Sequence, residues 1–153
     1  SGEKITGDRE ILSEAVRQDG HALRYASKAL RNDRLLVLSA VKRHGAALFY
    51  ASDERKADQT VVFVAVKADW RALECASREL RGDREIVLAA VKQNCLGALR
   101  FASLTARADR ETMLEAVKSN GEALQFASEK LQADSELLVI SRAHTTAKAK
   151  RKT

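Results

Sequence analysis

One pattern of about 25 residues is written five times along this chain, and the start of a sixth copy follows. Each full copy carries an aspartate, an Ala-Val pair, an Ala-Leu pair and an Ala-Ser pair in the same order. The aspartates are Asp8, Asp33, Asp58, Asp83, Asp109 and Asp134, and they are 25 residues apart except for one step of 26. Coincidence does not keep four markers in phase over five copies, so the chain is a tandem array of one structural unit.

Each unit reads as two short helices. In the fourth unit, Asp83 stands where its side chain would accept hydrogen bonds from the free N–H groups of a helix start. Ile86, Val87 and Ala90 follow at helical spacing on one face, and Lys92 lies in the last turn, where the helix dipole favours a cation. These features predict the first helix of the unit.

A short break follows the first helix and contains Gly20, Gly45 or Gly121 in units one, two and five. We expect these glycines to adopt the left-handed conformation that ends a helix. The second helix should run on from there, and Leu23 and Leu30 belong to its buried stripe in unit one. The Ala-Ser pair within this helix is small, which favours close packing of neighbouring units.

A lone hairpin of this size buries too little apolar surface to offset the conformational entropy lost on folding, so the units must stack. The predicted fold is an all-α solenoid of five two-helix repeats with a C-terminal capping helix. Residues 8–144 form this single domain, with units starting at the six aspartates, after an N-terminal extension at 1–7. The closing helix should end near His144, and the basic tail at 145–153 should be flexible. The extra residue of unit four falls in its inter-helix turn at 94–97, where insertions are tolerated.

The amino-acid composition further limits the kind of protein this chain can be. The 153 residues contain no proline, which favours uninterrupted helices. No apolar run exceeds six residues, as in Val61 to Val66, which is far short of the roughly 20 residues that cross a bilayer, so we expect no membrane insertion. Cys75 and Cys95 lack the spacing of a metal site and should be free thiols, which favours an intracellular reducing compartment. A net charge of +6 permits an anionic partner without requiring one.

The stretch from Asp83 to Asn94, followed by Ala98 to Ser103, resembles the repeats of the family called domain of unknown function 4116. The resemblance covers the chain from Asp8 to about Leu138. It implies a tandem helical-repeat protein, and it implies no activity and no functional residues, because the family has none assigned. Three positions depart from the pattern: Arg55 replaces a leucine, Trp70 replaces a glycine, and Cys75 replaces a tyrosine or phenylalanine.

Nothing in the sequence indicates catalysis. His21, His44 and His144 occupy three different places in the repeat, and the repeated serines stand at a packing position. No phosphate-binding loop, zinc-protease helix motif or glycine-rich dinucleotide turn occurs. We therefore expect no enzyme activity, no cofactor, and no catalytic or metal-binding residues.

Two columns of basic residues should run along the solenoid. The lysine column consists of Arg17, Lys42, Lys67, Lys92 and Lys118, and the arginine column consists of Arg9, Arg34, Arg84 and Arg110. Such columns could follow a nucleic-acid backbone. The alternative is that the lysine column stabilises the helix C-termini through the helix dipole, and that the arginine column pairs with carboxylates. No column of aromatic residues accompanies them to stack on bases, and glutamates interrupt the positive field.

Large apolar side chains break the repeat rule at Leu35, Phe49 and Trp70, all in units two and three. Local repacking of the core could absorb them. Alternatively they form an exposed patch of the kind that anchors a protein partner. We expect the chain to act as a protein–protein interaction module or as a scaffold subunit of a larger assembly. The alternative function is a nucleic-acid-binding solenoid that uses the lysine column.

Overall fold

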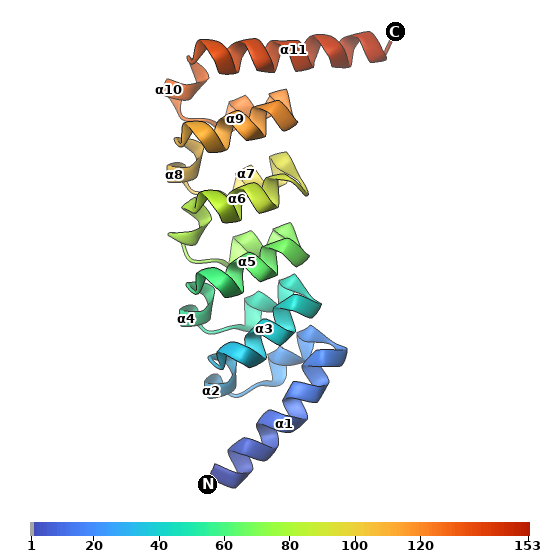
Figure 1. Ribbon diagram of the computed structural model, residues 1–153, viewed down its shortest axis with the longest axis vertical. Helices are drawn as coiled ribbons and strands as arrows, with labels where there is room; N and C mark the ends of the chain where they lie inside the picture. Colours follow the sequence, from blue (N-terminus) through green and yellow to red (C-terminus); the bar gives the residue numbers. More distant parts are fainter. Residues whose placement is uncertain (1) are drawn as a thin grey trace.

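The computed structural model describes the backbone of residues 2–153 and the side chains of residues 8–153, and Ser1 lies outside the described residues. The chain forms a single stack of helical layers with its two ends at opposite ends of the stack (Figure 1). All regular structure in residues 2–153 is helical, so the predicted all-α solenoid is confirmed. None of the described helices is both long enough and apolar enough to cross a membrane.

Each unit contributes one first helix to the stack. These helices are α1 (Gly2–Gln18), α3 (Arg34–Arg43), α5 (Gln59–Ala68), α6 (Arg84–Val91), α9 (Arg110–Ser119) and α11 (Ser135–Arg151). From unit two onward the repeated aspartate is the N-cap, because its carboxylate accepts a hydrogen bond from the backbone N–H three residues later. Asp8 differs, since it lies within α1, which already begins at Gly2 in the segment predicted as an extension.

The second half of each unit is not the single continuous helix that the sequence predicts. Units one, two, three and five begin it with a 3₁₀ helix: η1 (Gly20–Tyr25), η2 (Gly45–Tyr50), η3 (Trp70–Cys75) and η5 (Gly121–Phe126). The extra residue of unit four converts this segment into an α-helix, α7 (Cys95–Phe101). One helical turn then follows in every unit, and these turns line one edge of the stack (Figure 1): α2 (Lys28–Arg31), α4 (Asp53–Lys56), η4 (Leu80–Gly82), α8 (Leu104–Arg107) and α10 (Glu129–Gln132).

The second helix breaks at the Ala-Ser pair. The serine hydroxyl accepts a hydrogen bond from the backbone N–H three residues later, as between Ser52 and Arg55 at 3.2 Å. A serine in this role caps a new helix and so interrupts the preceding one. The backbone N–H of the same serine donates to a carbonyl of the preceding unit, from Ser52 to Arg31 at 3.0 Å and from Ser77 to Lys56 at 2.9 Å. Neighbouring units therefore approach closely at the Ala-Ser pair, as expected, and a backbone hydrogen bond joins them there.

The core lies between the first helices and the segments that follow them. In unit two, Leu36, Val37, Val41 and Leu48 each expose 2% of their surface or less. Equivalent apolar residues of units three to five are buried in the same cluster, whereas Ile11 at the corresponding position of unit one is 73% exposed and Thr112 replaces an apolar residue in unit five. Burying each such side chain contributes roughly 1.5–3 kcal/mol, and this contribution requires the neighbouring unit to be in place.

The turn glycines do not play the role that the sequence predicts. No glycine of the described chain has a positive φ, so none takes the left-handed conformation. Instead, the next first helix packs directly against them. A Cβ atom at Gly20 would lie 2.2 Å from the carbonyl oxygen of Ala40, and one at Gly45 would lie 2.2 Å from that of Ala65. Glycine is required here because neighbouring backbone occupies the space of a side chain.

The last layer is longer than predicted. The sequence predicts an end near His144, whereas α11 continues to Arg151 and projects beyond the rest of the stack (Figure 1). The alanine and lysine residues of this stretch have high helix propensity, which explains the continuation. Two contacts hold the first part of α11 on unit five: Ser141 Oγ donates to the Gly121 carbonyl at 2.8 Å, and His144 Nε2 lies 2.7 Å from the Lys118 carbonyl oxygen.

Candidate interaction surface

The arginine column is occupied by ion pairs between successive units. Each arginine reaches the N-cap aspartate of the next unit: Arg9 to Asp33 at 2.7 Å, Arg34 to Asp58 at 2.8 Å, Arg84 to Asp109 at 2.8 Å and Arg110 to Asp134 at 3.1 Å. Gln59 replaces the arginine in unit three and donates to Asp83 at 3.2 Å. The hydrogen bond from the guanidinium holds the pKa of Asp33, and likewise of Asp109, below the usual range. These arginines are therefore engaged with carboxylates, as the alternative interpretation of the column supposed.

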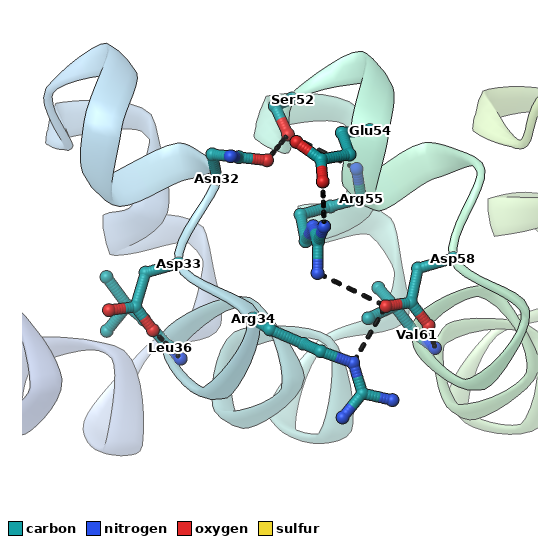
Figure 2. A network of polar contacts seen from close by, with 9 residues as sticks. All are labelled: Asn32, Asp33, Arg34, Leu36, Ser52, Glu54, Arg55, Asp58 and Val61. Carbon is teal, nitrogen blue, oxygen red and sulfur yellow. Dashed lines mark hydrogen bonds and ion pairs between the residues drawn. The ribbon is translucent and has the colours of Figure 1, made fainter.

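Arg55, which replaces a leucine of the repeat pattern, joins the ion pairs between units. Figure 2 shows Arg34 and Arg55 converging on Asp58, which also caps α5. Arg55 donates to Asp58 at 3.3 Å and to Glu54 at 2.7 Å, and its side chain is only 13% exposed. The position that holds leucine in units one, three and five thus becomes a charged link within the repeat junction, and Arg55 is engaged with one carboxylate of its own unit and one of the next.

The lysine column differs from the arginine column because most of its members are not paired with carboxylates in the part of the chain whose side chains are described. All five members are exposed: four lie in the last turn of α1, α3, α5 or α9, and Lys92 is the C-cap residue of α6. At the two ends, Arg17 pairs with Glu14 at 3.4 Å and Lys118 pairs with Glu115 at 3.1 Å. Between them, Lys42, Lys67 and Lys92 form no ion pair with any carboxylate of residues 8–153. Three consecutive units therefore each carry, on one surface, a lysine that forms no ion pair with residues 8–153.

An apolar column runs beside the lysine column, four residues earlier in each helix and hence on the same face. Its members are Leu38, Phe63, Leu88 and Leu114, all half-buried, and Val139, which is exposed. Together the two columns define what we call the outer face of the first helices. Between α5 and α6 this face is hollowed into an open groove lined by Phe63, Leu88, Lys67 and Lys92. Ser13 takes this position in unit one, and the column was not assigned to a site from the sequence.

The structure separates the three residues that break the repeat rule. Leu35 is 66% exposed at the start of α3, and Phe49 is 64% exposed in η2. The Phe49 ring packs edge-on against Tyr50 with centroids 5.3 Å apart, and the Lys56 ammonium lies 5.6 Å from its centroid. Leu35 and Phe49 thus remain candidate partner-binding residues on the surface of unit two.

Trp70 is turned away from them toward unit four. Its ring is half-buried and stacks on Phe101 with centroids 5.9 Å apart. A Cβ atom at Gly97 would lie only 2.4 Å from the indole, so the glycine of unit four makes room for the tryptophan of unit three. Trp70 is therefore accommodated by local repacking between units three and four, which is one of the two alternatives that the sequence left open.

A cluster of metal-ligating groups joins units one and two. The imidazoles of His21 and His44 stack with centroids 4.8 Å apart, and Asp19 Oδ1 lies 3.2 Å from His44 Nδ1. The backbone N–H of Gly20 donates to the same Nδ1 atom at 3.0 Å. Sequence reasoning missed this cluster because it compared the same repeat position in different units. The usable signal was that His44 replaces the aspartate or asparagine that the other units have at the turn.

Both cysteines are free thiols placed in the apolar layers. Cys75 is half-buried in η3, and Cys95 is buried at the start of α7. Burial raises the pKa of both thiols, so neither has the lowered pKa that marks a reactive cysteine. Cys95 Sγ lies 3.4 Å from the Ala116 carbonyl oxygen, in the place where units one and two have a glycine against the next helix.

Comparison with known proteins agrees with the repeat pattern. A family model described as "Domain of unknown function (DUF4116)" matches residues 8–56, 33–81, 58–105 and 109–140. These overlapping segments begin at four of the repeated aspartates and together span most of the chain. A search of curated proteins and a search of solved structures found no match. The chain therefore belongs to the family Domain of unknown function (DUF4116), as a tandem array of its repeats.

Proposed function

We propose that this chain is a non-catalytic protein-interaction module that binds an acidic segment with apolar side chains on the outer face of its first helices. The observation that carries the proposal is the meeting of two columns on that face. Lysines without carboxylate partners in residues 8–153 stand beside half-buried apolar side chains over three consecutive units.

The apolar column supplies surface that a partner can cover. Phe63 and Leu88 pack partly on the core and leave the remainder of their side chains at the groove between α5 and α6. Large apolar side chains at the centre of a contact carry most of the binding energy in protein interfaces. Polar residues flank this surface, since Lys67, Lys92 and Glu85 also line the groove. A central apolar contact with a charged rim is the usual composition of such an interface.

The lysine column selects the charge of the partner. Lys42, Lys67 and Lys92 stand at the C-terminal ends of successive first helices, so a segment laid across α3, α5 and α6 would meet one ammonium group per unit. Aspartate or glutamate side chains in that segment would neutralise charges that the chain itself leaves unpaired. Complementary charge of this kind mainly sets specificity and speeds association.

Nucleic-acid binding is the second candidate, and the same three lysines favour it. One observation weighs against it. The arginine column is engaged with aspartates of the repeat junctions and is not available to follow a phosphate backbone. Phosphate contacts also release counterions, so this candidate requires a steep loss of affinity with added salt, whereas binding through the apolar column does not.

Partner capture with matched variants tests the proposal. The immobilised full chain would be exposed to a lysate of its source organism and washed with and without nuclease, at low and at high salt. Leu88→Ser introduces the residue that unit one carries as Ser13, and Lys92→Glu reverses one unpaired charge. We expect a nuclease-resistant protein to be retained by the native chain and to be lost with either variant.

The control is Lys28→Glu, which makes the same charge change at an exposed site in α2, away from the outer face. It should retain the partner. Recovery of nucleic acid that moderate salt releases would favour the second candidate. A partner that both outer-face variants still bind would refute this surface as the site, and Leu35 and Phe49 would become the next candidates.

A further inference from the structure

The cluster of Asp19, His21 and His44 breaks the pattern of the repeat in a specific way. At the residue before the second segment, Asp19, Asp69, Asn94 and Asn120 each use their side chain to accept a backbone N–H of that segment. His44 occupies the same position in unit two, and η2 has no side-chain cap hydrogen bond. The unit therefore gives up a stabilising cap, and the imidazole is directed instead toward unit one, where it meets His21.

We propose that Asp19, His21 and His44 bind one divalent transition-metal ion of the Zn²⁺, Ni²⁺ or Cu²⁺ class. Each residue offers one ligand atom, and the three atoms all lie within 4.8 Å of one another. The centre of such a triangle is at most about 2.8 Å from each corner, and zinc bonds to nitrogen and carboxylate oxygen are about 2.0–2.2 Å long. The ligand atoms thus need to move by less than about 1 Å each to reach bonding distance of a common ion.

The side chains of Asp19 and His44 have room for this small movement, although Asp19 Oδ1 also accepts the His21 backbone N–H at 2.9 Å. The Asp19 side chain is 62% exposed and that of His44 is 41% exposed, so neither is held by surrounding core. An ion bound through His44 Nδ1 replaces the hydrogen bond from the Gly20 N–H, which makes the site weaker than a closed structural zinc site. Three protein ligands leave a further coordination position for water or for a side chain of a partner.

The ligand types decide which ions the cluster selects. Two imidazoles and one carboxylate suit Zn²⁺, Ni²⁺ and Cu²⁺, whereas Mg²⁺ and Ca²⁺ require predominantly oxygen ligands. Two arginines lie in the cleft that His21 and His44 help to line, and both are engaged elsewhere. Arg71 pairs with Asp69 at 3.0 Å, and Arg43 donates to the Gln18 carbonyl at 3.2 Å. The Asp69 carboxylate therefore compensates the charge of Arg71, whereas the neutral Gln18 carbonyl leaves the charge of Arg43 in place.

Titration calorimetry with ZnCl₂ on the full chain, prepared without a histidine tag, tests the site. We expect one ion per chain, together with shifts of the imidazole proton resonances of His21 and His44 in NMR spectra. The His144 resonances should not move, because this residue lies on α11 at the other end of the stack. MgCl₂ should produce no comparable heat.

The variants can be taken from the chain's own repeats, which keeps the fold intact. His44→Asn introduces the residue of units four and five, His21→Ala introduces the residue of unit two, and Asp19→Asn retains a capping side chain without its charge. Each should lower zinc affinity by at least about tenfold. Cys75→Ser is the control, since this thiol lines the same cleft and could bind zinc independently.

Three results would overturn the assignment. One is the absence of saturable zinc binding by the native chain. Another is zinc affinity that stays unchanged in His21→Ala and in His44→Asn. The third is zinc binding that disappears with Cys75→Ser but survives in both histidine variants. Circular dichroism of every variant checks that the helical stack is preserved, so a loss of binding reports the ligands.

Discussion

Adding one methyl group at Gly45 should destabilise the stack, although a glycine-to-alanine change at an unstrained site normally stabilises a protein by about 0.4–1 kcal/mol. The new Cβ atom would lie 2.2 Å from the Ala65 carbonyl oxygen and 2.9 Å from the Asp69 backbone nitrogen. Both are backbone atoms of unit three, so neither can move aside by changing a side-chain rotamer. To restore ordinary van der Waals contact, unit three must retreat by more than about 1 Å along much of the junction.

The size of the effect follows from that displacement. Overpacking a well-packed core costs about 1–3 kcal/mol, and a clash between two rigid backbones should lie at or above the upper end. For a chain of this length, a loss of about 3 kcal/mol lowers the melting temperature by roughly 6–12 °C. Thermal and urea denaturation followed by circular dichroism would measure it. Repeat proteins can unfold in parts, so several probes should be compared.

Gly82→Ala provides the matched comparison. Its Cβ atom would meet the Ser103 hydroxyl at 2.6 Å, and rotation of that side chain relieves the contact but gives up its cap on the Ala106 N–H of α8, so we expect a loss of about 1 kcal/mol. The two alanine variants should therefore differ clearly in stability. If Gly45→Ala were as stable as the native chain, then direct backbone contact would not be the reason for glycine in these turns.

Two further predictions concern charge and aromatic packing. Because Arg84 lowers the pKa of Asp109 in the folded chain, the pair stabilises the fold above roughly pH 4, and this contribution is lost as the pH falls toward the folded pKa. Arg84→Gln should therefore flatten the fall in urea midpoint below roughly pH 4, and an unchanged slope would contradict the assignment. Trp70→Ala should cost about 2 kcal/mol through its lost stacking on unit four, whereas Phe49→Ala should cost less than about 0.5 kcal/mol because its ring is mostly exposed. Equal losses for these two variants in the same denaturation experiment would show that their burial has been misread.

Much of the architecture could be predicted because it rests on local chemistry. Aspartate is a strong N-cap wherever a helix begins, so the repeated Asp33, Asp58 and Asp83 marked true helix starts. Apolar residues at helical spacing marked the buried faces in the same way. The second helix was the main error, because the serine of the Ala-Ser pair was treated as a small packing residue. Its hydroxyl instead competes for backbone hydrogen bonds and breaks the helix, as at Ser52.

The candidate sites were less accessible to sequence reasoning. Lys67 and Phe63 were both visible in the sequence, but whether a cation is free or paired depends on what the next unit places beside it. Arg34 and Lys67 illustrate this, since the next unit offers Asp58 to Arg34 whereas Lys67 has no carboxylate partner in residues 8–153. The cluster of His21 and His44 likewise arises from residues at different repeat positions, which only stacking brings together.

The sequence alone determined that this chain is a tandem array of helical units, where the first helix begins in units two to six, and most of the side chains that enter the core, because capping and helical periodicity act within a few residues. Tertiary structure decided what lies between units. The distance and rotation between neighbouring layers set the contact of Gly45 with Ala65, the direction of Trp70, and the pairing of each arginine with the next aspartate. These are contacts between residues some 25 positions apart, and their geometry depends on how whole layers pack rather than on any local pattern.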